Sequence, residues 1–403
     1  MSDSGSASLV SGDVRTHNLS LLMRRLVDAG PSARSDLASA TGLARGSVTA
    51  LVGVLIEAGL VRETEVVPGE GAGRPRTLLS IAADSVALLA LQLDADQAIA
   101  VAHDLDGTEL LRVAEHHGRP MGDPEAVIDV AARVLGSALD DLEAGGRRVA
   151  GLTVVVFAPV GEEPRVVVAD TDLGWGRVDV LAGLRALEPR LPRSATLTSD
   201  VIAAALAEAS LIDDVTDLLY LKSNSGIGGA IISGGVLVEG RHHLAGALGH
   251  IAVDYDGALC DCGQRGCLVT VAGPDVVLER AGLADVLQHD GLTRALELLV
   301  ERVHTGDEEA TAAFVAAADW VARAIAIVRM TLDPQIILLG GYWAELSDLI
   351  GAPAAQRMRL AAYGSELAPP PVVAGTLGAD AAILGALWRL RADLLADPLA
   401  LSA

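Results

Sequence analysis

The sequence predicts an α/β protein in which a small helical domain with a β-hairpin precedes a larger α/β body. Its 403 residues are enough for two or three domains, each with its own core. Apolar residues recur at helical spacing near the N-terminus, whereas beyond residue 85 short apolar runs alternate with Ala/Leu-rich helical stretches. That alternation is typical of an α/β body.

Two helices are expected between residues 18 and 41. The Gly30-Pro31 pair ends the first helix. Its apolar positions lie at helical spacing: Leu19, Leu22, Met23 and Leu26. Ser32 is the expected N-cap of the second helix, with Ser35 as the alternative, because a hydroxyl there accepts a bond from an otherwise unpaired backbone amide. Leu37 and Ala38 are then expected to face the core.

The third helix follows a tight turn at residues 41–43 and has the pattern of a DNA recognition helix. Its apolar positions fall on one face: Val48, Leu51, Val52 and Leu55. The outward face then presents Arg45, Ser47 and Thr49, which we predict to contact base edges in the major groove. A small helical bundle without a nucleic-acid role has the same periodicity and is the alternative.

A β-hairpin is predicted after this helix, from residues 60–66 and 76–81, and would form the wing of a winged helix-turn-helix. The loop between them is rich in glycine and proline and ends in Gly73-Arg74-Pro75-Arg76. Two guanidinium groups on such a stiff turn suit a minor groove or phosphates, so Arg74 and Arg76 are candidate DNA contacts. An ordinary linker turn is the alternative.

The body is expected to form two lobes that divide near residue 195. Short apolar runs predict strands at residues 86–93, 152–156, 218–221 and 336–339, and the Ala-rich stretch 308–330 is interpreted as a core helix. The expected domains are therefore residues 1–85, 86–195 and 196–403. The C-terminal helix is expected to pack back on the first lobe.

The formal net charge of −23 is unevenly distributed. Residues 1–85 carry 8 Arg against 9 acidic residues, so nearly all the negative charge belongs to the body. Because DNA repels negative charge, any DNA contact must come from the first segment. Lys222 is the only lysine, which we interpret as a bias in base composition. Without a membrane-length apolar run or signal-peptide features, a cytoplasmic protein that does not contact membranes is expected.

All three cysteines fall within eight residues, as Cys260-Asp-Cys262-Gly-Gln-Arg-Gly-Cys267, and His250 lies ten positions upstream. Three thiolates and one imidazole satisfy tetrahedral Zn²⁺, and a full set of four protein ligands is typical of a structural site. A disulfide is the competing interpretation. The odd number of cysteines in a chain without secretory features argues against it.

Several motifs resemble those of the ROK family, named for repressors, open reading frames and kinases. In the first segment they are Arg34-Ser-Asp-Leu-Ala, Thr41-Gly-Leu, Leu55-Ile-Glu-Ala-Gly-Leu-Val-Arg and Gly73-Arg-Pro. In the body they are Gly249-His250 with the cysteine pattern, Leu105-Asp-Gly, Leu173-Gly-Trp175, Gly226-Ile-Gly, Leu244-Ala-Gly, Asp333-Pro, Leu339-Gly-Gly341 and Leu384-Gly-Ala.

This resemblance covers most of the chain and implies a winged helix-turn-helix followed by a two-lobed, actin-like body similar to sugar kinases. It implies that zinc fixes the loop bordering the sugar pocket, and it adds Arg34 to the expected DNA contacts. Ala44 departs from the family, which usually has a serine that caps the recognition helix. This costs about 1 kcal/mol of helix stability but removes no base contact.

The resemblance also indicates what the body has lost as a kinase. Kinases of the family carry Asp-x-Gly-Gly-Thr at the first strand, where backbone amides hold the ATP phosphates. The matching stretch is Asp94-Ala-Asp96-Gln97-Ala, so two polar side chains replace both glycines. ATP binding in the family manner is therefore not expected, and Gly226-Ile-Gly-Gly229 is interpreted as a tight turn.

The sugar pocket departs from the family as well. The family's Asn-Asp pair is Ser199-Asp200, so the carboxylate that acts as base in the kinases survives. Two glutamates that hydrogen-bond sugar hydroxyls in the family are replaced by Ala247 and Val269. A site that loses such partners should lose affinity for polyols. Ser199, Asp200 and His250 remain the candidate ligand contacts.

Three hypotheses follow. The first is a non-enzymatic DNA-binding regulator, expected to repress carbohydrate-related genes, whose body senses a ligand other than free hexose or none. The second is a sugar-sensing repressor with a rebuilt pocket. The third is a ROK kinase that phosphorylates a hexose or amino sugar with ATP. For a regulator, the expected partner is double-stranded DNA with a palindromic operator, bound by a homodimer or homotetramer. The effector would be a sugar or sugar derivative.

Overall fold

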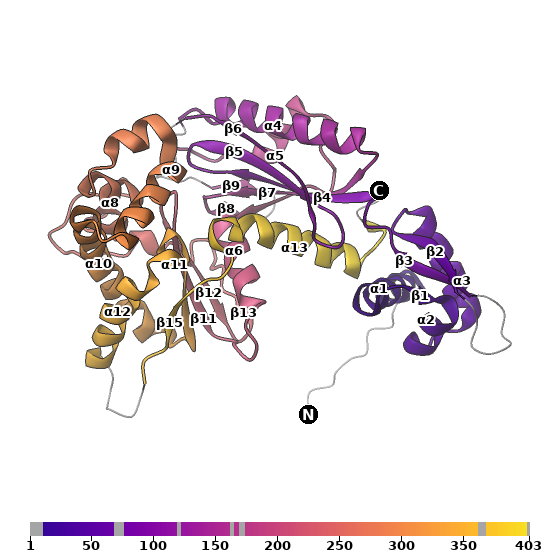
Figure 1. Ribbon diagram of the computed structural model, residues 1–403. Coiled ribbons are helices and arrows are strands. Elements are labelled where there is room, and N and C mark those ends of the chain that lie inside the picture. Colours follow the sequence, from indigo (N-terminus) through magenta and orange to yellow (C-terminus); the bar gives the residue numbers. More distant parts are fainter. Residues whose placement is uncertain are drawn as a thin grey trace.

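The computed structural model describes residues 11–67, 76–118, 122–161, 165–168, 174–361 and 368–400. It is an α/β protein, as predicted, with a small head before the first body strand and a body built on two five-stranded sheets (Figure 1). The head lies at one end of the molecule and the body extends away from it.

The head is a winged helix-turn-helix built from three helices and a three-stranded sheet in the order β1-β3-β2. These elements are α1 (Ser11–Ala29), β1 (Ser32–Ala33), α2 (Arg34–Thr41), α3 (Arg45–Glu57), β2 (Val61–Val67) and β3 (Arg76–Ile81). The predicted apolar faces of all three helices are buried, and β2 and β3 form the predicted antiparallel hairpin.

The predicted serine cap of the second helix is wrong. Helix α2 begins at Arg34 with Ala33 in the N-cap position, and no side chain caps it. Ser32 lies in β1 and donates its hydroxyl to the Gly30 carbonyl at 3.0 Å, while Ser35 donates to Asp36. The reason is the pairing of β1 with β3, which holds the backbone extended up to Ala33.

The first body sheet has the strand order β10-β7-β4-β5-β6. Its strands are β4 (Val86–Leu93), β5 (Gln97–His103), β6 (Glu109–His116), β7 (Arg148–Val156) and β10 (Thr196–Ser199). Helices α4 (Pro124–Ala144) and α5 (Val180–Leu187) pack on one face, and a small hairpin of β8 (Val160–Gly161) and β9 (Val166–Val167) follows β7. All eight residues of β4 are buried, as expected for a strand covered on both faces.

The second body sheet has the order β13-β12-β11-β14-β15. Its strands are β11 (Leu218–Ser223), β12 (Ile227–Ser233), β13 (Val236–Leu237), β14 (Ile336–Gly341) and β15 (Val372–Ala374). The helices of this half are α7 (Val269–Ala272), α8 (Pro274–Arg280), α9 (Ala284–His304), α10 (Glu308–Leu332), α11 (Tyr342–Glu345) and α12 (Ser347–Ala361), with short 3₁₀ turns η1 (Leu248–His250) and η2 (Gly378–Asp380).

Helix α10 is long and apolar enough to cross a bilayer, and it is the single helix of that kind in the part of the chain that the structure describes. Half of its most apolar window is buried inside the protein, and it packs against α12, α9 and α8. This is the environment of a core helix, as the sequence predicted.

Helices α6 (Asp200–Ala209) and α13 (Ala381–Ala396) pack tightly together between the two sheets. A Cβ on Gly385 would lie 2.1 Å from the Ala203 carbonyl oxygen, so only glycine permits this approach. Helix α13 also contacts β4 and β7, and it reaches α1 of the head. Strand β10, which begins just after the predicted division near residue 195, pairs with β7 of the first sheet.

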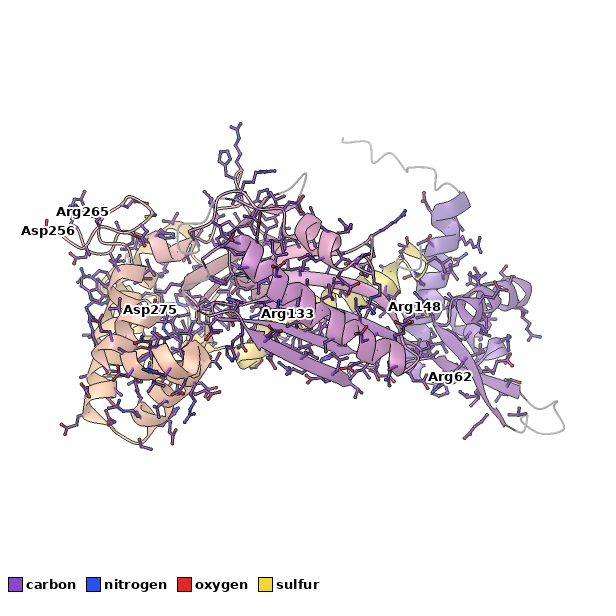
Figure 2. All side chains as sticks on the ribbon, turned by 90° about the horizontal axis from the view of Figure 1, so that it is seen from above. Arg62, Arg133, Arg148, Asp256, Arg265 and Asp275 are labelled. Atoms are coloured by element: carbon purple, nitrogen blue, oxygen red, sulfur yellow. The ribbon has the colours of Figure 1, made fainter. Side chains whose placement is uncertain are left out.

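The head meets the body through backbone carbonyls that follow α3 and β3. Ser85 donates its hydroxyl to the carbonyls of Gly59 and Ala82, and the Arg148 guanidinium donates to the Ala58 carbonyl at 3.1 Å. Figure 2 shows Arg148 on the body side of this junction and Arg62 on the head. Arg62 pairs with Asp84 at 2.7 Å, so the segment that leads into β4 is held on both sides.

Candidate functional site

The four predicted zinc ligands come together in one cluster. One donor atom from each of His250, Cys260, Cys262 and Cys267 lies within 4.8 Å of the others. Cys260 and Cys267 are buried and Cys262 is half-buried. We call residues 250–267 the metal hairpin; its residues Asp256 and Arg265 lie at the end of the molecule opposite the head (Figure 2).

Glycines allow the metal hairpin to fold back on itself. Gly266 has φ +67°, and a Cβ there would overlap the Asp254 carbonyl. Gly249 places His250 in the cluster, since a Cβ on it would lie 2.5 Å from the Ile227 carbonyl oxygen. The Cys260 amide donates to the Gln264 carbonyl at 2.8 Å and closes the loop between the cysteines. The spacing of the cysteines is therefore fixed by backbone geometry.

The distances in the cluster fit a tetrahedral metal ion. The Cys262 and Cys267 sulfurs are 3.6 Å apart, and the Cys260 sulfur is 3.7 Å from His250 Nδ1. A tetrahedral zinc ion about 2.3 Å from each sulfur separates its sulfur ligands by roughly 3.8 Å. A disulfide is excluded because its sulfurs are bonded at about 2.05 Å.

Burial disfavours the thiolate forms of these cysteines when no cation is present. It raises the pKa of Cys267 to about 12 and raises the pKa of Cys260 as well. A metal ion reverses this preference, because its charge stabilises the deprotonated ligand. The cluster is thus suited to a divalent cation that binds thiolates.

A cavity of about 360 Å³ borders the metal hairpin, and it contains the predicted ligand contacts Ser199, Asp200 and His250. Ala247 and Cys262 also line it, whereas Val269 is not among its lining residues and begins α7. Most of the remaining lining is apolar or glycine. The polar side chains of the lining are those of Ser199, Asp200, Lys222, Ser225, His243, His250 and Gln264.

Lys222 was missed as a site residue. Its ammonium lies 2.5 Å from the Asp200 carboxylate, and both side chains are about 10% exposed in the cavity wall. Asp200 is the first residue of α6, and Lys222 is next to last in β11. Its status as the sole lysine was the available signal, but composition cannot say which acid a lysine meets.

The turn between β4 and β5, residues 94–96, and Gln97 at the start of β5 contact the second half of the body. The Asp96 carboxylate is buried and accepts a bond from the Leu292 amide at 2.8 Å, where Gly291 interrupts α9 with φ +86°. Gln97 donates to Thr293 at 3.4 Å, and Ser225 donates to the Asp94 carboxylate. Asp94, Asp96 and Gln97 therefore all contact the second half of the body.

The predicted DNA contacts divide into two groups. Arg45, Ser47 and Thr49 are exposed on the outer face of α3, as expected. Arg34 and Arg76 are engaged within the head: Arg34 pairs with Glu63 of β2 at 2.7 Å, and Arg76 pairs with Asp36 of α2 at 2.9 Å. Arg74 lies outside the described residues. Arg45 is the arginine of α3, and it forms no ion pair within the described part of the chain.

Comparison with known proteins gives one family. Residues 89–392 match the ROK family. A solved ROK family transcriptional regulator, a homologue of the E. coli MLC protein, aligns with a TM-score of 0.72 at 23% identity and covers 96% of this chain and 98% of its own. A ROK family glucokinase from Streptomyces griseus, solved with glucose and AMPPNP, gives 0.63 at 23% identity and covers 76% and 99%.

Curated relatives match a shorter stretch. N-acetylmannosamine kinases of Shigella boydii and Escherichia fergusonii are 33% and 35% identical over 144 residues, which is 36% of this chain and 47% of each relative. The chain thus matches about half the length of these relatives. The structural likenesses show the fold, and the family match spans both sheets of the body. The chain belongs to the ROK family.

Proposed function

We propose that this protein is a DNA-binding transcription regulator whose ROK body is a non-catalytic effector-binding and dimerising part. The observation that carries this proposal is the exposed face of α3, with Arg45, Ser47 and Thr49, on a winged helix at the end of the molecule. The likeness to a solved ROK regulator, which extends over 96% of the chain, supports it. The expected role is repression of carbohydrate-related genes in the cytoplasm.

The ion pairs of the head give Arg34 and Arg76 a defined part in this proposal. They tie α2 to both strands of the wing and so set the position of the wing beside α3. Exposed pairs of this kind are easily exchanged for phosphate partners, because each contributes only about 0–1 kcal/mol. Arg45 on α3 is the residue expected to read bases, and Arg74 the residue expected to enter the adjacent groove.

A structural zinc ion completes the proposed body. His250 and the three cysteines would hold it, and four protein ligands leave no position for a reacting molecule. When bound, the ion supplies the cross-link that fixes the metal hairpin beside the cavity. His250 and Cys262 belong to both the cluster and the cavity wall, so the ion would hold that wall in shape.

The helices between cavity and head offer a route for an effector signal. Asp200 in the cavity wall begins α6, α6 packs closely on α13, and α13 contacts α1 of the head. The Gly385 contact couples α6 and α13 at backbone distance. A ligand that shifted Asp200 would therefore act on an element that touches the DNA-binding part.

The test begins with selection of bound genomic fragments by the purified full chain. Affinity for a selected operator is then measured by fluorescence anisotropy as a function of salt. Arg45→Ala should weaken binding by about 1–3 kcal/mol, a loss of roughly fivefold to 150-fold. Arg133→Ala on α4 removes the same charge from the body (Figure 2) and should leave affinity unchanged. Equal affinities of the two variants would contradict the assigned surface.

The kinase alternative has its own support in the N-acetylmannosamine kinase relatives. The β4–β5 turn argues against it, because the resemblance places Asp96 where family kinases carry a phosphate-binding glycine, and an acidic residue there disfavours phosphate. The check is a radiolabelled ATP assay with hexoses and N-acetylmannosamine as acceptors. Turnover above that of an Asp200→Asn variant would overturn the non-enzymatic proposal.

A further inference from the structure

The single lysine, Lys222, lies between two glycines on the neighbouring strands. Lys222 pairs with Gly228 on one neighbouring strand and with Gly340 on the other, so neither cross-strand neighbour carries a side chain. All other basic residues of the chain, apart from histidines, are arginines. A compact ammonium with three rotatable donors differs from a planar guanidinium fork, and a buried position can require the first. The composition bias that we inferred from the sequence does not account for this placement.

The cavity is almost free of negative charge in a strongly acidic protein. The chain has 53 acidic residues against 30 lysines and arginines. Yet Asp200 is the one carboxylate among the described lining residues, and Lys222 neutralises it. An anion that enters this cavity therefore meets no unpaired acidic side chain from that lining.

The Lys222 ammonium has more N–H donors than its carboxylate partner uses. Lys222 has three N–H groups, and among the described residues Asp200 is its single polar partner. One Asp200 oxygen bonds this ammonium, and the other accepts from the Val201 amide. Two ammonium donors are thus available to a bound molecule. A carboxylate or phosphate, which only accepts hydrogen bonds at neutral pH, is the matching group.

We propose that the cavity binds a small hydroxylated molecule that carries one anionic group, a carboxylate or a phosphate, and that Lys222 is the residue that contacts this group. The inference rests on the proposed function in treating the cavity as an effector site. Asp200 would hold an adjacent hydroxyl with its remaining lone pairs. Lys222 thereby determines specificity for an acid or phosphate ester of a sugar over the neutral sugar.

The experiment compares matched probes on the full chain. Calorimetric titration and thermal shift are measured with glucose, gluconate and glucose 6-phosphate, and with N-acetylmannosamine and its 6-phosphate. At least one anionic probe should bind ten times or more tighter than its neutral counterpart. A carboxylate-only or phosphate-only response identifies the source of the anion. Binding of neutral probes as tight as their anionic counterparts, or no binding of any anionic probe, would overturn the proposal.

Variants locate the effect at Lys222. Lys222→Met leaves Asp200 buried without its partner and is expected to destabilise the fold. The double variant Lys222→Met/Asp200→Asn therefore serves as the uncharged comparison of similar size. It should fold and lose the preference for anionic probes, whereas Arg133→Ala should keep it. A retained preference in the folded double variant would contradict the assignment. Operator binding is measured separately on ligand-free protein, so failure of DNA binding and failure of anion binding are distinguishable.

Discussion

The metal hairpin and the β4–β5 turn are two loops of the same body that differ in what they retain. Relative to the motifs of the ROK family, the metal hairpin keeps all four donors, and their distances fit one tetrahedral ion. The β4–β5 turn has exchanged both glycines for Asp96 and Gln97, which now contact α9. The loop that shapes the cavity is intact, and the loop that would bind ATP has become a contact between the two halves.

This difference indicates which properties the body needs. A kinase needs a turn with free backbone amides, because phosphate oxygens bind there. On the proposed function, a scaffold that joins a cavity to a DNA-binding head needs defined loops, and its two halves must be held in a fixed position. The polar side chains of Asp94, Asp96 and Gln97 link the two halves of the body, and they leave the turn without the glycines that a phosphate site needs.

The largest effect is expected at the metal hairpin. Cys260→Ser should reduce bound zinc from one ion per chain to below about a tenth, and should lower the free energy of unfolding by more than about 4 kcal/mol, as losses of metal sites do. Metal content and chemical denaturation measure both. Asp261→Ala, between two ligands but without a donor in the cluster, is the control. If Cys260→Ser bound a full equivalent of zinc, the assignment of Cys260 as a ligand in the metal hairpin would be wrong.

A smaller effect is expected at the β4–β5 turn. Asp96→Ala removes the acceptor of the Leu292 amide, which begins the second segment of α9, and should cost about 1–2 kcal/mol of unfolding free energy. Urea denaturation gives the stability, and hydrogen exchange at Leu292 gives the local effect. Asp106→Ala in the exposed β5–β6 turn is the matched control. Equal free energies of unfolding for the two variants would show that the Asp96 contact does not stabilise the fold.

The smallest effect is expected at the neighbouring position. Gln97→Ala removes a long, partly exposed bond to Thr293 and should change stability by less than about 0.5 kcal/mol. The same urea measurement applies. If Gln97→Ala lowered the free energy of unfolding as much as Asp96→Ala does, the link between the two halves would depend on both side chains rather than on one carboxylate.

Local patterns in the sequence predicted much of the fold and part of the site. Helical spacing identified the buried face of α3, and the short spacing of the cysteines predicted the four donors that the structure brings together. Both depend on residues that lie close in the chain. The serine cap of α2 was predicted wrongly because β1 pairs with β3, a contact that the local sequence does not contain.

The rest of the site depends on contacts between distant residues. The Asp96 carboxylate meets an amide 196 positions away, and Lys222 meets Asp200 across the junction of a strand and a helix. Periodicity gives no information on such partners. The ion pairs of Arg34 and Arg76 within the head belong to the same class, since their partners are 29 and 40 residues away.

Lys222 also allows the opening of the core to be followed by proteolysis. A protease specific for lysine has one cleavage point in these 403 residues, after Lys222. That peptide bond lies in β11, the central strand of the second sheet, in which every residue is buried. Two fragments can therefore form only when this strand opens, so their rate of appearance measures the opening of the core without any introduced label.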